Sequence, residues 1–190
     1  MDLPSSPQRF TREELLSYAG RTIPDLVGDD LRLLFVGINP GLVSAATGLH
    51  FARTGNRFYP ALRMAGILPA DVVTPQDARP VLLERGIGIT NLVARASARA
   101  DELEPGELVE GRARLEAFVD AHRPRVVAIA GITSYRVAFG RRTARAGRQD
   151  VTLGDAQLWV VPNPSGLNAH ETVDSLAAAY REAAVAAGVV

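Results

Sequence analysis

Two residue types are missing from this sequence: it contains no cysteine and no lysine. Without cysteine the chain cannot form a disulfide, a thiolate zinc site, an iron–sulfur cluster or a cysteine nucleophile. All 21 basic residues are arginine, so a lysine Schiff base and a lysine-dependent phosphate loop are excluded too. The three histidines, His50, His122 and His170, are far apart and have no metal-ligand spacing. We therefore expect neither a metal nor a cofactor.

Long apolar runs are also absent. No stretch approaches the roughly 20 apolar residues that span a bilayer, and the first residues, MDLPSSPQRF, lack the apolar centre of a signal peptide. A chain of 190 residues with 47% hydrophobic and 22% charged residues is typical of one globular domain. We expect a cytoplasmic protein with a single domain over residues 1–190 and no membrane contact.

The formal net charge is zero, but the charges are unevenly distributed. Residues 32–70 contain four arginines and no acid, and residues 136–148 contain five arginines and no acid. Two basic segments can form one positive face for a polyanion. Chance clustering in an arginine-rich chain explains the charge pattern equally well. A net charge of zero argues against tight binding to nucleic acid without sequence preference.

Short apolar runs alternate with helical patterns along the chain. The runs predicted as strands, each closed by turn residues, are 32–38, 88–92, 125–131 and 157–161. The segments predicted as helices from caps and apolar spacing are 11–18, 56–65, 74–86, 107–121, 132–139 and 171–187. Residues 42–55 and 93–105 are predicted to be loops. This alternation indicates an α/β fold whose mostly parallel sheet is covered on both faces.

Two Asn-Pro turns follow predicted strands directly, in the loops Gly37–Gly41 and Asn163–Leu167. Either turn alone can have a purely structural role, since these residues are common turn formers. Ligands of parallel α/β folds bind beyond the carboxyl ends of the strands, however, and both turns lie there. Asparagine and glycine-exposed backbone N–H groups can orient a water and bind a flat polar ring or a developing anion.

A longer set of residues at fixed spacing begins at the first of these turns. It consists of Gly37-Ile-Asn-Pro-Gly-Leu42, Ser44, Thr47-Gly48, Phe51-Ala52 and Asn56-Arg57-Phe58. This set resembles the first motif of the mismatch-specific uracil-DNA glycosylase and thymine-DNA glycosylase family, and Asn163-Pro-Ser-Gly-Leu167 resembles its second. Gly88-Ile-Thr-Asn-Leu-Val93 also falls in family order. The resemblance covers about residues 30–182 and leaves an N-terminal helical extension.

The resemblance implies a three-layer α/β/α fold with a central, mostly parallel sheet. It further implies base excision repair: flipping and excision of uracil, and also of thymine or damaged pyrimidines, from mismatched double-stranded DNA by hydrolysis of the N-glycosidic bond. With no lysine present, we expect a monofunctional, cofactor-free enzyme. The expected partner is duplex DNA with mismatched or damaged bases, bound by a monomer that associates with the nucleoid.

By resemblance, Asn39 positions the attacking water and Phe51 stacks on the flipped base. The remaining residues expected to bind substrate are Ile38, Gly41, Ser44, Asn163 and Ser165. The expected wedge, which enters the space left by the flipped base, is Gly166, Leu167 and Asn168. The chain departs from some relatives at three positions, where it has Val43, Asn91 and Ala169.

Asp101 is a second candidate catalytic residue. An amide cannot remove a proton, and Asp101 lies in an irregular stretch that follows a predicted strand, on the cleft side of the sheet. It can equally cap the next helix or pair with Arg99. Two other functions also remain open at this point: a non-catalytic binder of mismatched or damaged DNA, and a hydrolase of small nucleotides.

Overall fold

The computed structural model describes residues 9–190. The first eight residues lie outside the described residues. They include most of the segment MDLPSSPQRF, which lacks the apolar centre of a signal peptide. A five-stranded sheet of order β2-β1-β3-β5-β4 forms the centre of the molecule. The parallel strands are β1 (Leu33–Gly37), β2 (Ile87–Asn91), β3 (Val126–Ala130) and β5 (Ala156–Val161). The α/β class and the four predicted strands are thereby confirmed.

The fifth strand, β4 (Gly147–Leu153), was not among the predicted strands. It pairs antiparallel with β5 at the edge of the sheet, through a tight turn at Gly154. Exposed and partly buried residues alternate along most of β4, because one of its faces meets solvent. A strand of this kind has no continuous apolar run, which is the signal that identified the other four.

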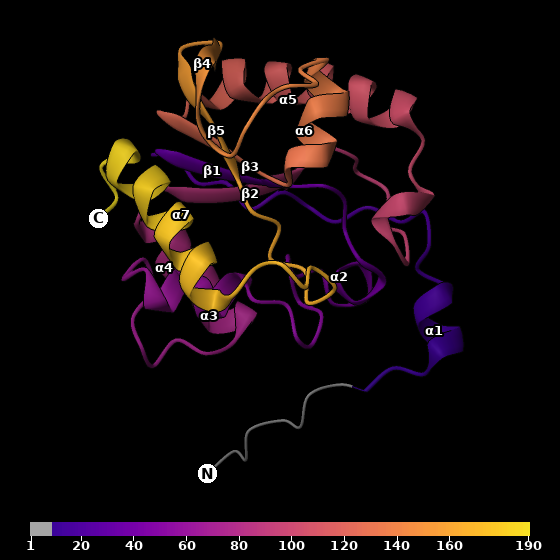
Figure 1. The fold of residues 1–190 in the computed structure, drawn as a ribbon. Helices are drawn as coiled ribbons and strands as arrows, with labels where there is room; N and C mark the ends of the chain where they lie inside the picture. Colours follow the sequence, from indigo (N-terminus) through magenta and orange to yellow (C-terminus); the bar gives the residue numbers. More distant parts are fainter. Residues whose placement is uncertain (1–8) are drawn as a thin grey trace.

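Helices cover both faces of the sheet, as expected (Figure 1). One face carries α3 (Phe58–Met64), α4 (Pro75–Glu84) and α7 (Val173–Ala187), and the other carries α5 (Pro105–His122) and α6 (Ile132–Phe139). Two shorter helices are α1 (Arg12–Leu16) and α2 (Leu42–Thr47), and η1 (Ala100–Glu102) is a single 3₁₀ turn. Helix α1 begins with a capping box at Thr11, and both of its hydrogen bonds are present.

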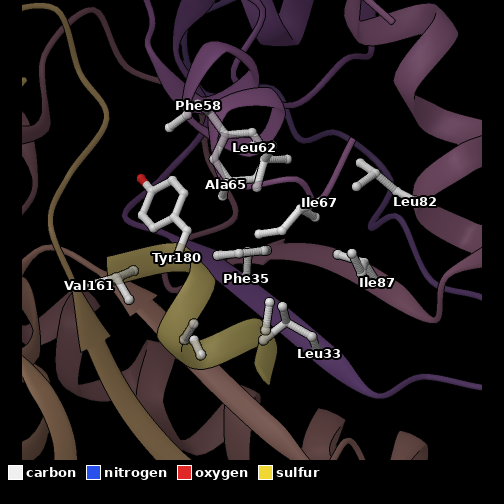
Figure 2. Close-up of a cluster of buried hydrophobic side chains, with 14 of the residues drawn as sticks. Leu33, Phe35, Phe58, Leu62, Ala65, Ile67, Leu82, Ile87, Val161 and Tyr180 are labelled. Atoms are coloured by element: carbon white, nitrogen blue, oxygen red, sulfur yellow. The ribbon is translucent and has the colours of Figure 1, made fainter. Parts of the chain in front are cut away.

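Side chains of β1 alternate between two apolar cores. Leu33 and Phe35 pack on the side of α3, α4 and α7, whereas Leu34 and Val36 pack on the side of α5 and α6. Figure 2 shows the first core, where Phe35 lies among residues from the helices, including Phe58 and Tyr180. This strand is fully buried, so the loop that follows it starts from a rigid position.

One prediction about the connecting segments needs correction, and another holds. Residues 42–47 form helix α2 rather than a loop, because the Ala-rich turn packs the buried Ser44 against the following segment. Residues 93–105 are irregular as predicted, apart from η1. Among the described residues, no helix is both long and apolar enough to cross a bilayer.

Candidate functional site

Both Asn-Pro turns line one cavity of about 400 Å³ at the carboxyl edge of the sheet. We call residues 38–57, which follow β1, the first loop, and residues 162–171, which follow β5, the second loop. Small-molecule sites usually enclose about 300–1,000 Å³, so the cavity can hold a nucleotide. The two turns, which both follow predicted strands, therefore lie at one cavity.

The structure brings nearly all the residues expected at the site together. Those that line the cavity are Ile38, Asn39, Gly41, Ser44, Phe51, Asp101, Asn163, Ser165, Leu167 and Asn168. Gly166 alone is absent from the lining: a Cβ built on it would lie 2.7 Å from the carbonyl oxygen of Gly55. Glycine at this position therefore lets the two loops pack backbone against backbone.

The ring of Phe51 lies against Gly37 at the end of β1, and the backbone of Phe51 has an unusual conformation. Its φ of +54° lies in the left-handed region, which disfavours a side chain. The ring stacks on Phe58 with centroids 4.1 Å apart. A Cβ on Gly37 would lie 3.4 Å from this ring and 2.5 Å from Oδ1 of Asn91. The absence of a Cβ at Gly37 therefore leaves room for the Asn91 amide in its present position, whereas the Phe51 ring would be at ordinary contact distance.

The amide of Asn39 has a defined orientation. Its Nδ2 donates to the carbonyl of Arg95 at 3.1 Å and to Oγ of Ser97 at 2.8 Å. The Ser97 hydroxyl donates its own proton to the carbonyl of Arg99 at 2.6 Å, so toward Asn39 it can only accept. Both amide hydrogens are thus used, and Oδ1 is the atom left to accept a hydrogen bond in the cavity.

Arg95, whose carbonyl holds Asn39, is itself fixed by an acid on α5. Its guanidinium donates to both carboxylate oxygens of Glu107, at 2.6 and 2.8 Å. This pairing, together with the backbone N–H of Glu104, lowers the pKa of Glu107 to about 2. The irregular segment that carries Arg95 and Ser97 is therefore anchored to the start of a long helix.

Asn91 and His50 form a second polar pair beside Phe51. His50 is buried, and its Nε2 lies 3.0 Å from the carbonyl of Pro24, so Nε2 carries the proton. Its Nδ1 then accepts from Nδ2 of Asn91 at 3.5 Å. Burial lowers the pKa of His50, which favours this neutral form. His50 was not expected at the site, since its partners are distant in the chain.

Asp101 lies at the rim of the cavity and is bonded to Arg99. Both of its carboxylate oxygens accept from that guanidinium, at 3.0 and 2.6 Å, and its side chain is 63% exposed. It does not cap α5, whose N-cap is Glu104. Among the described residues Asp101 is the one carboxylate that lines the cavity.

The basic segments lie only partly near the cavity. Arg53 lines it, but Arg32 is at the opposite end of β1 and pairs with Asp30, so residues 32–70 do not form one positive face. In residues 136–148, Arg141 pairs with Asp150 at 3.2 Å. The turn before Gly147 reaches the carboxyl edge of the sheet, because Gly147 pairs with Val160 near the end of β5.

Within residues 9–190, no group of three His, Asp or Glu side chains could hold a metal ion. One comparison with known proteins identifies a relationship. The family model described as the uracil DNA glycosylase superfamily matches residues 24–185, which include both loops and every strand of the sheet.

Proposed function

Because the chain belongs to the uracil DNA glycosylase superfamily, we propose that it is a monofunctional glycosylase of mismatched double-stranded DNA. Membership in the superfamily indicates an enzyme that excises uracil or another base from DNA. The proposal adds the mismatch-specific branch, with uracil as the principal base and thymine or damaged pyrimidines as further ones. It also treats residues 1–190 as one glycosylase domain that acts as a monomer on chromosomal DNA.

One observation carries the proposal: Asn39 and Phe51 line the same cavity with their functional groups available. Phe58 covers part of the Phe51 ring, and the ring still borders the cavity. A flipped base can stack there, an interaction worth about 1–3 kcal/mol per base. The fixed Oδ1 of Asn39 can accept a hydrogen from a water molecule aimed at the sugar.

The reaction that follows is a hydrolysis. The C1′–N1 bond breaks, its electron pair leaves with the base, and the sugar develops oxocarbenium character. The water oxygen forms the new bond to C1′, and its proton must go to an acceptor. We assign that acceptor to Asp101, the carboxylate at the rim of the cavity. The products are the free base and an abasic sugar with a hydroxyl group at C1′.

The departing base carries a developing negative charge, which polar hydrogens in a dry cavity stabilise. We assign this role to backbone N–H groups of the first loop, those of Ile38, Asn39 and Gly41 and those near Phe51. The amide of Asn91, beside Gly37, is an additional group that can bind a polar base edge. Ser44, Asn163 and Ser165 complete the proposed substrate contacts.

Leu167 is suited to the wedge role because its side chain is 69% exposed at the mouth of the cavity. An apolar side chain inserted into the duplex offsets the loss of stacking when a nucleotide flips out. Gly166 and Asn168 flank it in the second loop. This exposure has a simple explanation if the residue is buried by DNA.

The proposal is tested by excision from four substrates: duplexes with uracil opposite guanine, uracil opposite adenine and thymine opposite guanine, and single-stranded DNA with uracil. Alkaline cleavage of the strand reports each abasic site. We expect multiple turnovers with release of free uracil, fastest opposite guanine. Binding without turnover would identify a mismatch-binding protein, and cleavage of free nucleotides would identify a small-molecule hydrolase.

A further inference from the structure

The hydrogen bonds that the second loop makes within itself are short-range. Oδ1 of Asn163 accepts from the backbone N–H of Ser165 at 3.0 Å, and Nδ2 of Asn168 donates to the carbonyl of Asn163 at 3.3 Å. The backbone N–H of Leu167 donates to Oγ of Ser165 at 3.3 Å. Such bonds shape the turn, but they do not attach it to the rest of the molecule.

Arg57, in the first loop, supplies that attachment. Its Nη2 donates to the carbonyls of Ser165 and Asn168, at 2.5 and 2.8 Å, and its Nη1 donates to the carbonyl of Glu171. Its backbone N–H also donates to the carbonyl of Pro164 at 3.0 Å. One guanidinium therefore binds the second loop on both sides of Leu167 and at the end of the loop.

The guanidinium of Arg57 forms these hydrogen bonds, and it makes no ion pair within residues 9–190. The nearby carboxylate of Glu171 accepts instead from Oγ of Ser175 at 2.6 Å, at the start of α7. Hydrogen bonds from a charged donor are stronger than neutral ones, and the planar fork of arginine can reach several carbonyls at once. Three carbonyls in one loop are a well-matched set of acceptors.

Two further contacts surround this arginine. Gly55 and Gly166 bring the two loops together at a separation that a Cβ on Gly166 would prevent. The hydroxyl of Tyr180, on α7, donates to the carbonyl of Pro162 at 3.1 Å, where the second loop begins. The start of the loop is thus fixed by α7 and its centre by the first loop.

We infer that Arg57 is the positioning residue for base flipping, which fixes the second loop on the first so that Leu167 enters the duplex from a preformed loop. A preformed loop avoids the cost of ordering on binding. It also keeps the inserted side chain aligned with the cavity that receives the base. This inference rests on the proposed function for the wedge role, while the attachment itself is independent of activity.

The attachment is tested by amide hydrogen exchange of Arg57→Met in the complete protein without DNA. Loss of charged hydrogen bonds should speed exchange of the amides at residues 167–171 by about tenfold or more. Arg181→Met is the matched control, because Nη1 of Arg181 donates to the carbonyl of Ala65 at 2.8 Å, outside the cavity lining. It should leave exchange in the second loop unchanged.

The role in flipping is tested by a double-mutant cycle of Arg57→Met with Leu167→Ala. On a duplex with uracil opposite guanine, Arg57→Met should slow single-turnover excision by about 10²-fold, as expected for a misplaced group. In the Leu167→Ala background it should add little, because the side chain that it positions is gone. Arg57→Lys, which keeps the charge without the planar fork, should stay well below the wild-type rate.

Wild-type exchange in Arg57→Met, additive effects in the cycle, or full activity of Arg57→Lys would each overturn the inference. If Arg57→Met does not fold, Arg57→Lys provides the same exchange and kinetic comparisons. If the wild-type protein excises no uracil, the proposed function fails, and the exchange experiment still decides whether Arg57 holds the loop.

Discussion

The two loops that form the cavity are held in different ways. The first follows β1, a fully buried strand, and its Asn39 amide is fixed through Ser97 and Arg95. Arg95 is bonded in turn to α5 by Glu107. The second loop follows β5, beside the edge strand, and its centre is held by the side chain of Arg57.

This difference separates two tasks. A reacting water must be held within a small distance of its target, so the residue that orients it benefits from several independent supports. A wedge instead has to enter the duplex from a preformed loop, which Arg57 holds at its centre and Tyr180 at its start. We therefore expect changes in the first loop to alter the chemical step and changes in the second loop to alter engagement of the duplex.

Asn39→Ala should have the largest effect. With no Oδ1 to orient the water, single-turnover excision should fall by about 10³-fold at saturating enzyme, with duplex affinity unchanged. Asn168→Ala is the matched control from the second loop, another asparagine that lines the cavity. It should weaken duplex binding more than it slows the chemical step. A wild-type rate for Asn39→Ala would overturn the assignment of the first loop.

Asp101→Asn should have the second-largest effect. If Asp101 accepts the proton of the attacking water, the single-turnover rate should fall by about 10²-fold, in the range for lost general-base assistance. Glu102→Gln is the control, since this neighbour is in the same 3₁₀ turn and does not line the cavity. An unchanged rate for Asp101→Asn would show that Asp101 has only a structural role, in its ion pair with Arg99.

Ser97→Ala tests the support behind Asn39. One amide hydrogen then loses its acceptor and the amide can rotate, so the rate should fall by about tenfold, the usual effect of a lost buried hydrogen bond. Ser97→Thr, which keeps the hydroxyl, should restore the rate, and duplex affinity should be the same in both variants. A wild-type rate for Ser97→Ala would show that the Arg95 carbonyl alone fixes the amide.

The fold was largely predictable because most of its strands are continuous apolar runs. The run 33–37 is buried on both faces, and hydrophobicity alone identifies such a strand. Strand β4 was not predicted, because its stability comes from pairing with β5 rather than from its own composition. Helix α2 was missed because it is only six residues long and lies between Gly41 and Gly48, and the packing of Ser44 helps to fix this turn.

The site was predictable where the chemistry sits directly after a strand. Asn39 and Asn163 both occupy that position, and Asn91 does as well, at the end of the strand beside β1. A search for polar residues at every strand end would have found it. Arg57 belongs to the first motif, but its contacts and those of Ser97 were not predicted, since their partners lie about 110 and 58 residues away in the chain and no local pattern marks such contacts.

The smallest expected effect comes from charge outside both loops. Arg141 and Arg142 are exposed, and their turn leads to the carboxyl edge of the sheet beside β5. Changing both to Gln should weaken duplex binding for all sequences, without altering base preference, and should reduce the salt dependence of log K by about one unit per lost phosphate contact. Because Asp150 already pairs with Arg141, most of the change should come from Arg142.

Arg32→Gln with Arg85→Gln, at the amino ends of β1 and β2, is the matched control and should leave the salt dependence unchanged. Equal slopes for the two double variants would show that residues 136–148 are solvated surface, and that duplex recognition rests on the two loops alone.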